Sequence, residues 1–143
     1  MKNSSTVCVD ASIVVRSVLF PDDSIQDLWE SWQTDGTRLV APTLLYYEVA
    51  NSLNQYQKRA EINADVIRRV YETALALPFS LIGDASLHRR AMVLAATYRL
   101  PAAYDAHYLA LAEHLGVELW TADVRLFNAL QPFKLDWIKL AVG

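Results

Sequence analysis

The feature that most restricts the fold of this chain is the alternation of short β-branched runs with longer segments of helical spacing. The run TVCVD at 6–10 predicts a buried strand, and residues 11–20 then take up the spacing of an amphipathic helix. Parallel strands need long crossover connections, which are usually helices, so this alternation favours a parallel sheet. The sequence therefore predicts an α/β fold in which helices cover both faces of a mainly parallel central sheet.

The same alternation continues along the chain. We predict further strands at 38–42, 79–84, 117–123 and 134–140, and further helices at 23–36, 43–60, 63–78, 85–100, 104–116 and 124–130. Asn63 is expected to cap its helix, and Gly116 to end the helix before it. The chain has 143 residues, 53% of them hydrophobic, and shows no linker or repeat, so we expect a single domain over 1–143.

Composition argues against several classes of protein. The net charge of -3, from 13 basic and 16 acidic residues, disfavours nucleic-acid binding through a general excess of positive charge. No apolar run approaches the roughly 20 residues that cross a bilayer, and the first residues lack the pattern of a signal peptide. We therefore expect a cytoplasmic protein with no membrane partner. The single cysteine, Cys8, lies in an apolar run and is expected to be a core residue.

Four acidic residues stand beside segments that are expected to be buried. Asp10 and Asp123 each close a predicted strand, and Asp105 begins a predicted helix, so each of them alone is best explained as a helix cap. Glu48 falls in the second turn or later of the helix at 43–60, where capping is impossible, on the border of the apolar stripe. An ordinary boundary glutamate with an exposed carboxylate is the alternative for that residue.

Together, the four acids predict more than any one of them does. In an open parallel sheet the ligand crevice lies outside the carboxyl ends of the strands, where Asp10 and Asp123 are expected, and Asp105 can border it. Converging carboxylates repel one another, and a divalent cation removes this conflict. Oxygen ligands without paired His or Cys favour Mg²⁺ or Mn²⁺, and such ions at an acidic pocket suit phosphodiester hydrolysis.

Four segments of the chain also match a known family. They are VCVDAS, APTLLYYEVANSL, YDAHYLALAEHLG and LWTAD, in family order and with family-like spacing over 6–127. On these segments the chain resembles the PIN-domain nucleases, and most closely the VapC-type toxins of prokaryotic toxin–antitoxin pairs. The resemblance implies a PIN-like three-layer α/β fold and a metal-dependent endoribonuclease that hydrolyses RNA phosphodiester bonds. It also implies a homodimer, neutralised by a cognate antitoxin protein that covers the acidic groove.

The resemblance further implies roles for individual residues. The catalytic acids, which would also be the ligands of Mg²⁺ (or Mn²⁺), are Asp10, Glu48, Asp105 and Asp123. The supporting polar residues are Ser12, Asn51 and Thr121. Ser12 could instead help to cap a helix, and Asn51 could be only a surface amide.

Other polar and aromatic residues have more ordinary explanations. A solvated helix face accounts for most of the basic candidates for RNA contact, which are Arg38, Lys58, Arg59, Arg68, Arg69, Arg89, Arg90 and Arg125. We expect the histidines on the surface at His88, His107 and His114. Core packing or a dimer interface is expected for Trp29, Trp32, Tyr46 and Tyr108, whereas Tyr104, next to Asp105, is kept as a possible groove residue.

Two other functions stay open from the residues alone. A catalytically idle PIN-like module could bind RNA or protein, but such a module would be expected to have lost one or more of the acids. A response-regulator receiver or an aspartyl-phosphate phosphatase shares the fold class. Against both, VCVDAS lacks a second Asp two residues after the first, and no lysine stands at a strand end to complete a phosphorylation site.

Overall fold

A computed structural model describes residues 5–59 and 62–141 of the chain. Residues 1–4, on which part of the signal-peptide expectation rests, lie outside these ranges. The strands are β1 (Thr6–Val9), β2 (Arg38–Pro42), β3 (Phe79–Ile82), β4 (Glu118–Thr121) and β5 (Ile138–Leu140). The helices are α1 (Ala11–Leu19), α2 (Asp23–Thr34), α3 (Leu45–Lys58), α4 (Ala64–Leu75), α5 (Ala85–Thr97), α6 (Ala103–Leu115), α7 (Val124–Leu130) and the 3-10 helix η1 (Gln131–Phe133). Within the described ranges, no helix has the length and apolarity needed to span a bilayer.

The strands form one parallel sheet in the order β3-β2-β1-β4-β5. The central strand is β1, in which Cys8 is opposite Val40 of β2 and Leu119 of β4. The chain moves outward from β1 through β2 to β3 and then returns to the other side of β1 at β4. A parallel sheet with such a reversal opens a crevice at the carboxyl ends of the strands that flank the reversal. The predicted parallel α/β fold is confirmed, and the crevice is expected beside β1 and β4.

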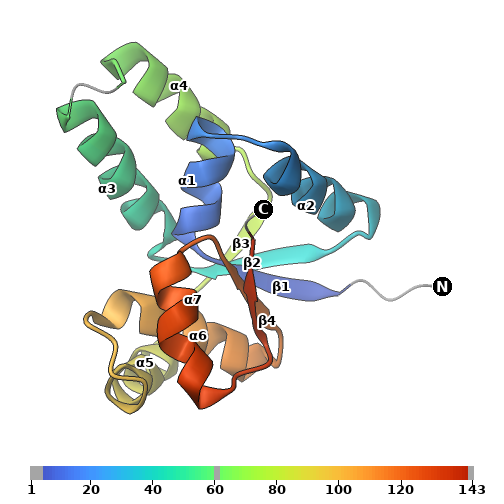
Figure 1. The fold of residues 1–143 in the computed structure, drawn as a ribbon, viewed down its shortest axis with the longest axis vertical. Helices are drawn as coiled ribbons and strands as arrows, with labels where there is room; N and C mark the ends of the chain where they lie inside the picture. The colour runs from blue at the N-terminus through green and yellow to red at the C-terminus, as the bar shows by residue number, and fades with distance from the viewer. Residues whose placement is uncertain (1–4, 60–61, 142–143) are drawn as a thin grey trace.

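Helices cover both faces of the sheet, as the three-layer fold requires. Figure 1 shows α1, α2, α3 and α4 on one side of the strands and α5, α6 and α7 on the other. Alternate residues of β1 serve the two layers: Val7 and Val9 pack with Ile25 and Trp32 of α2, whereas Cys8 belongs to the cluster that includes α6. This period of two is the ordinary consequence of strand geometry.

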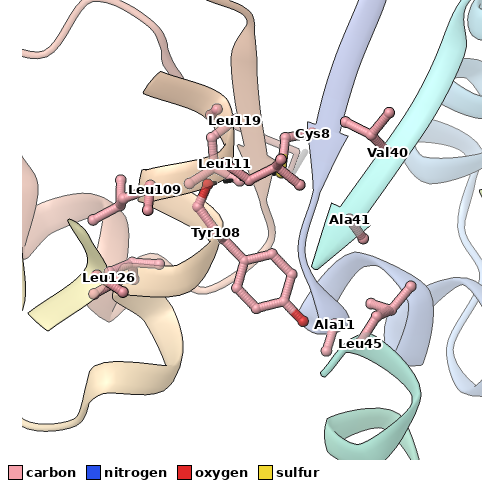
Figure 2. Close-up of a cluster of buried hydrophobic side chains, with 14 of the residues drawn as sticks. Cys8, Ala11, Val40, Ala41, Leu45, Tyr108, Leu109, Leu111, Leu119 and Leu126 are labelled. Atoms are coloured by element: carbon pink, nitrogen blue, oxygen red, sulfur yellow. Dashed lines mark hydrogen bonds between the residues drawn. The ribbon is translucent and has the colours of Figure 1, made fainter. Parts of the chain in front are cut away.

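The central helix of the larger core is α6. Its residues 106 and 108–112 are all buried, because the helix packs on the sheet and is covered by α5. Figure 2 shows Leu111 of α6 beside Cys8 and Leu119 of the strands, and Leu109 on the other side of the helix, where Leu126 lies. A helix that is apolar on nearly all sides is expected in this position. It explains why the segment before Gly116 is so rich in Leu and Ala.

The element pattern predicted from the sequence is largely confirmed, with two differences. The helix predicted at 43–60 begins at Leu45, so Glu48 lies in its first turn rather than the second. The last strand, predicted at 134–140, begins only at Ile138, because Lys134 has a positive φ of 54° and residues 136–137 form a turn.

Gly116 provides a test of this helix end, because it ends α6 with a φ of +67° and nothing lies within 4 Å of where its Cβ would be. Gly116→Ala should therefore lower the free energy of unfolding by about 1 to 2 kcal/mol through backbone strain alone. Urea denaturation would measure this. Gly116→Asn should lose less, since Asn tolerates this conformation better, and an Asn variant that is no more stable than the Ala variant would contradict the assignment.

Candidate active site

A cavity of about 550 Å³ opens at the carboxyl ends of β1 and β4. Its walls come from the start of α1, from α3, from the first turns of α6 and from the junction between β4 and α7. All four predicted acids line it: Asp10, Glu48, Asp105 and Asp123. Ser12 and Asn51 line it as well, and Thr121 lies directly behind it, bonded to Asp10. The tertiary structure thus brings together residues that are far apart in the sequence.

Asp10 is the most deeply buried of the acids, at 4% exposure. It caps α1, where its Oδ1 accepts from the backbone N–H of Ser12 at 3.1 Å and from the Ser12 hydroxyl at 2.5 Å. Its Oδ2 accepts from the hydroxyl of Thr121 at 2.5 Å. Burial raises the pKa of Asp10 to about 7, although the hydrogen bonds from Ser12 and Thr121 lower it and the charge of Asp105 raises it. The carboxyl is thus held in place but resists ionisation.

The hydroxyls of Ser12 and Thr121 connect the two neighbouring strand ends. Ser12 Oγ accepts from the backbone N–H of Ala122 at 2.8 Å and lies 3.2 Å from Thr121 Oγ1. Thr121 Oγ1 in turn accepts from the backbone N–H of Asp123 at 3.0 Å. These bonds satisfy buried backbone donors and place Asp123 beside Asp10. Ser12 and Thr121 therefore support the acids through hydrogen bonds that the structure itself contains.

Asp123 and Asp105 differ in how they are held. Asp123 caps α7, accepting from the backbone N–H groups of Arg125 at 3.0 Å and Leu126 at 3.3 Å. Asp105 lies in the first turn of α6 without capping it, because the capping position belongs to Ala102. Burial raises the pKa of Asp105, the charge of Asp123 raises it further, and Arg125 lowers it. Capping thus explains Asp10 and Asp123, but the capping interpretation is wrong for Asp105.

Glu48 enters the cavity from the opposite wall, on α3. It is half-buried and makes no capping bond. Burial raises its pKa, the nearby Tyr108 hydroxyl lowers it, and the charge of Asp105 raises it. Its Oε1 is buried and has no hydrogen-bond partner among the described residues. The alternative of a boundary glutamate with an exposed carboxylate is therefore wrong, since an unpaired buried oxygen is unusual in a merely structural residue.

Tyr108 is the residue of the cavity wall whose polar end the sequence did not reveal. It is 1% exposed, in agreement with its predicted core position, but it also lines the cavity. Its hydroxyl, like Glu48 Oε1, lacks a hydrogen-bond partner in the described part of the chain. One signal was present: Tyr108 follows Asp105 by three residues, which places the two side chains on the same side of a helix.

The residues suit a hard divalent cation. Four carboxylates, with hydroxyls behind them, line one cavity, and the charges of Asp105 and Asp123 already oppose each other. Mg²⁺ and Mn²⁺ prefer such all-oxygen surroundings. In the present side-chain conformations of the described residues, no three potential ligands are already gathered at ion-binding distance. Binding would therefore require some of the carboxylate side chains, such as that of Glu48, to move toward the ion.

Aromatic side chains border the cavity where it meets solvent. Tyr104, predicted as a possible groove residue, lines the cavity and is 64% exposed. Tyr47 lines it too and is 79% exposed, a feature that the sequence did not reveal. Of the basic candidates, Arg125 lies beside the acids, with its Nε 3.9 Å from Asp123 Oδ1. Arg90, by contrast, is paired with a glutamate of α6 on the surface.

The histidines lie away from the cavity. His88 and His114 are exposed, as predicted. His107 is only partly exposed, because α5 packs on α6 and brings His88 Nδ1 within 2.9 Å of His107 Nε2. His107 is thus at the surface as predicted, but it is partly covered by its contact with His88. Cys8 is buried, and burial raises the pKa of its thiol far above the ordinary value, so it is a core residue as expected.

Comparison with known proteins gives consistent matches to one family. The family model described as PIN domain matches residues 7–130 of the chain. The VapC ribonuclease Mb0985 of Mycobacterium bovis is 32% identical over 125 residues, which make up 87% of this chain and 91% of that protein. The match to the family model spans all four acids of the cavity, and the match to the relative covers most of the chain.

Solved structures share the fold at lower sequence identity. A toxin–antitoxin complex from Klebsiella pneumoniae contains a chain with a TM-score of 0.65 and 17% identity, covering 96% of this chain and 98% of that one. The structure of VapC20 from Mycobacterium tuberculosis, described as a sarcin–ricin loop cleaving toxin, has a TM-score of 0.61 and 15% identity, covering 86% and 94%. At these identities the similarity establishes the fold.

The raised pKa of Asp10 predicts how stability depends on pH in the presence of a chelator. The folded chain keeps this proton up to a pH of about 7, whereas the unfolded chain releases it near the ordinary value of 3.8. Between these values the folded state binds more protons, so the free energy of unfolding should fall as pH rises, by up to about 1.4 kcal/mol per unit for one proton. The raised pKa values of Glu48 and Asp105 act in the same direction.

In the Asp10→Asn variant, the free energy of unfolding should fall less steeply with pH, and the variant should be more stable than the wild type near pH 7. Denaturation series between about pH 4 and 7 would measure both. Asp27→Asn, at an exposed position on α2 away from the cavity, is the matched control and should keep the wild-type slope. Equal slopes in the Asp10 variant and the wild type would show that Asp10 does not hold its proton in the folded chain.

Proposed function

The chain belongs to the PIN domain family, and on this basis we propose that it is a metal-dependent endoribonuclease, the toxin of a toxin–antitoxin pair. The observation that carries the proposal is the meeting of four carboxylates in one cavity at the carboxyl ends of β1 and β4. The name of the M. bovis relative, a VapC ribonuclease, supports the same activity. The reaction would be hydrolysis of an RNA phosphodiester bond.

The four acids would hold Mg²⁺ or Mn²⁺: Asp10, Glu48, Asp105 and Asp123. When bound, such ions supply a water of lowered pKa and stabilise the leaving oxygen. Ser12 and Thr121 keep Asp10 in one orientation through the bonds at 2.5 Å, so its oxygens need no reordering. The helix-capping bonds of Asp123 do the same for that carboxylate. No side chain has to act as a covalent nucleophile in this reaction.

The surroundings of the cavity fit a single RNA strand. Exposed aromatic rings stack on unpaired bases, and Tyr47 and Tyr104 present such rings at the edge of the cavity. A second cavity of about 510 Å³ shares Ser12 with the first and is bordered by Arg16 and Phe20. We propose that the strand continues into it, which would give an acidic protein local contacts for a polyanion without a general positive charge.

Two partners belong to this proposal. A cognate antitoxin would cover the acidic cavity, and a second copy of the chain would form a homodimer. The exposed Met92 and Val93 on α5, at 66% and 51%, offer an apolar surface for protein contact. Because the substrate would be cellular RNA, we propose that the protein acts in the cytoplasm. Light scattering of the purified chain would establish the oligomeric state.

Asp105→Asn tests the proposed reaction, since this acid caps nothing and its loss should leave the fold intact. With a mixed set of structured and unstructured RNAs, cleavage should require Mg²⁺ or Mn²⁺, disappear in chelator and fall by at least about a hundredfold in the variant. Asp27→Asn, with the same change of charge at an exposed site on α2, should cleave as the wild type does.

The same experiment separates the catalytic proposal from the binding-module alternative. A folded wild-type chain that retains RNA but cleaves none of it at any Mg²⁺ or Mn²⁺ concentration would favour the idle module. Full activity in the Asp105→Asn variant would remove the acidic cavity from the reaction altogether.

A further inference from the structure

Tyr108 is placed between the core and the acidic cavity. Figure 2 shows its ring extending from α6 so that the hydroxyl points to the starts of α1 and α3, where Ala11 and Leu45 lie. Its backbone is held in the core, where its carbonyl oxygen accepts from the Cys8 thiol at a donor–acceptor distance of 3.8 Å. Tyr108 is therefore both a core residue, 1% exposed, and a residue of the cavity wall.

The hydroxyl of Tyr108 and the Oε1 of Glu48 are a buried donor and a buried acceptor, each without a partner among residues 5–59 and 62–141. Leaving either group unsatisfied costs on the order of 1 to 3 kcal/mol. Both side chains line the same cavity. A tyrosine that served only as packing would satisfy the core equally well as phenylalanine, so the hydroxyl itself calls for an explanation.

The two groups also act on each other electrostatically. Burial is the largest cause of the raised pKa of Tyr108, and the charge of Glu48 is the second. In turn, the Tyr108 hydroxyl lowers the pKa of Glu48. The side chains are thus neighbours, although the atoms do not form a hydrogen bond of acceptable geometry. In a bond between these two groups the hydroxyl is the donor and the carboxylate oxygen the acceptor.

Glu48 needs such a partner more than Asp10 or Asp123 does. Asp10 is fixed by two hydroxyls and Asp123 by the helix that it caps. Glu48 has a longer side chain, makes no capping bond and has an unpaired buried oxygen. A ligand with more rotatable bonds loses more conformational entropy when it is ordered, unless the protein orders it beforehand.

We propose that Tyr108 is a positioning residue: when the metal ion binds, its hydroxyl donates to Glu48 Oε1 and leaves the other carboxylate oxygen for the ion. This inference rests on the proposed metal-dependent function and assigns an additional residue to its site. Tyr108 touches neither the RNA nor the reacting atoms. Its effect passes through Glu48 to the affinity for the ion, in the way that outer partners of metal ligands commonly act.

The test is the affinity for Mn²⁺, measured by calorimetry and by electron paramagnetic resonance on the metal-free full-length chain. Tyr108→Phe keeps the ring and removes only the hydroxyl, so the dissociation constant should rise about tenfold or more. The melting temperature in chelator should be unchanged or higher, because an unsatisfied buried group has been removed. RNA cleavage should need more Mn²⁺ but recover at saturation, with the KM for RNA unchanged.

Tyr71→Phe is the matched control. Its hydroxyl, on α4, donates to the carbonyl oxygen of Tyr46 on α3 at 3.2 Å, and Tyr71 is not among the residues that line the acidic cavity. This variant should lose some stability and keep the wild-type affinity for Mn²⁺. A stability loss alone therefore cannot imitate the expected effect of Tyr108→Phe.

A double-mutant cycle with Glu48→Gln tests whether Tyr108 acts through that residue. In the Glu48→Gln background, removal of the Tyr108 hydroxyl should change the Mn²⁺ dissociation constant by less than about twofold. Wild-type affinity in Tyr108→Phe, or the same tenfold loss in both backgrounds, would overturn the positioning role while leaving the proposed nuclease intact. Absence of Mn²⁺ binding by the wild type would overturn the proposed metal site itself, and the inference with it.

Discussion

The structure of the site depends on one buried carboxylate, that of Asp10 at the end of the central strand. Its oxygens accept bonds from the Ser12 backbone N–H and hydroxyl and from the Thr121 hydroxyl, and the Ser12 hydroxyl accepts in turn from the backbone beyond β4. A single ionisable group thus joins β1, α1 and β4 at the topological switch point. Burying it is costly, and the hydrogen bonds offset that cost only in part, since its pKa stays raised at about 7.

The other acids add to this unfavourable charge instead of relieving it. Burial and mutual repulsion raise the pKa values of Glu48 and Asp105, and Arg125 is the cation that opposes them at the cavity edge. An arrangement of this kind lowers stability in the absence of a ligand, a cost commonly found where residues are arranged for function. It is best explained by a cation that the site is built to receive, which is the basis of the proposed nuclease reaction.

The core and the site are continuous through α6. Leu111 of this helix packs in the core with the strands, while Asp105 in its first turn and Tyr108 line the cavity. The same helix therefore positions Asp105 and also, in our proposal, Tyr108, whose hydroxyl is the partner of Glu48 on α3. Sites that rest on packed helices hold their geometry better than sites on loops, which suits a reaction that depends on placing carboxylates around an ion.

The sequence by itself determined the α/β class, most element positions and the places of Asp10 and Asp123, because period, capping and strand ends are local properties of neighbouring residues. Gly116 likewise predicted the end of α6, because the left-handed conformation of that residue depends only on the local backbone, which glycine adopts readily. Only the tertiary structure decided that Glu48 is half-buried in a first turn and that it lines the same cavity as Tyr108. These two residues are 60 positions apart, on helices α3 and α6, and no local pattern encodes how two helices dock. A helical wheel shows that the Tyr108 ring is buried, but what its hydroxyl meets depends on the packing of the whole domain.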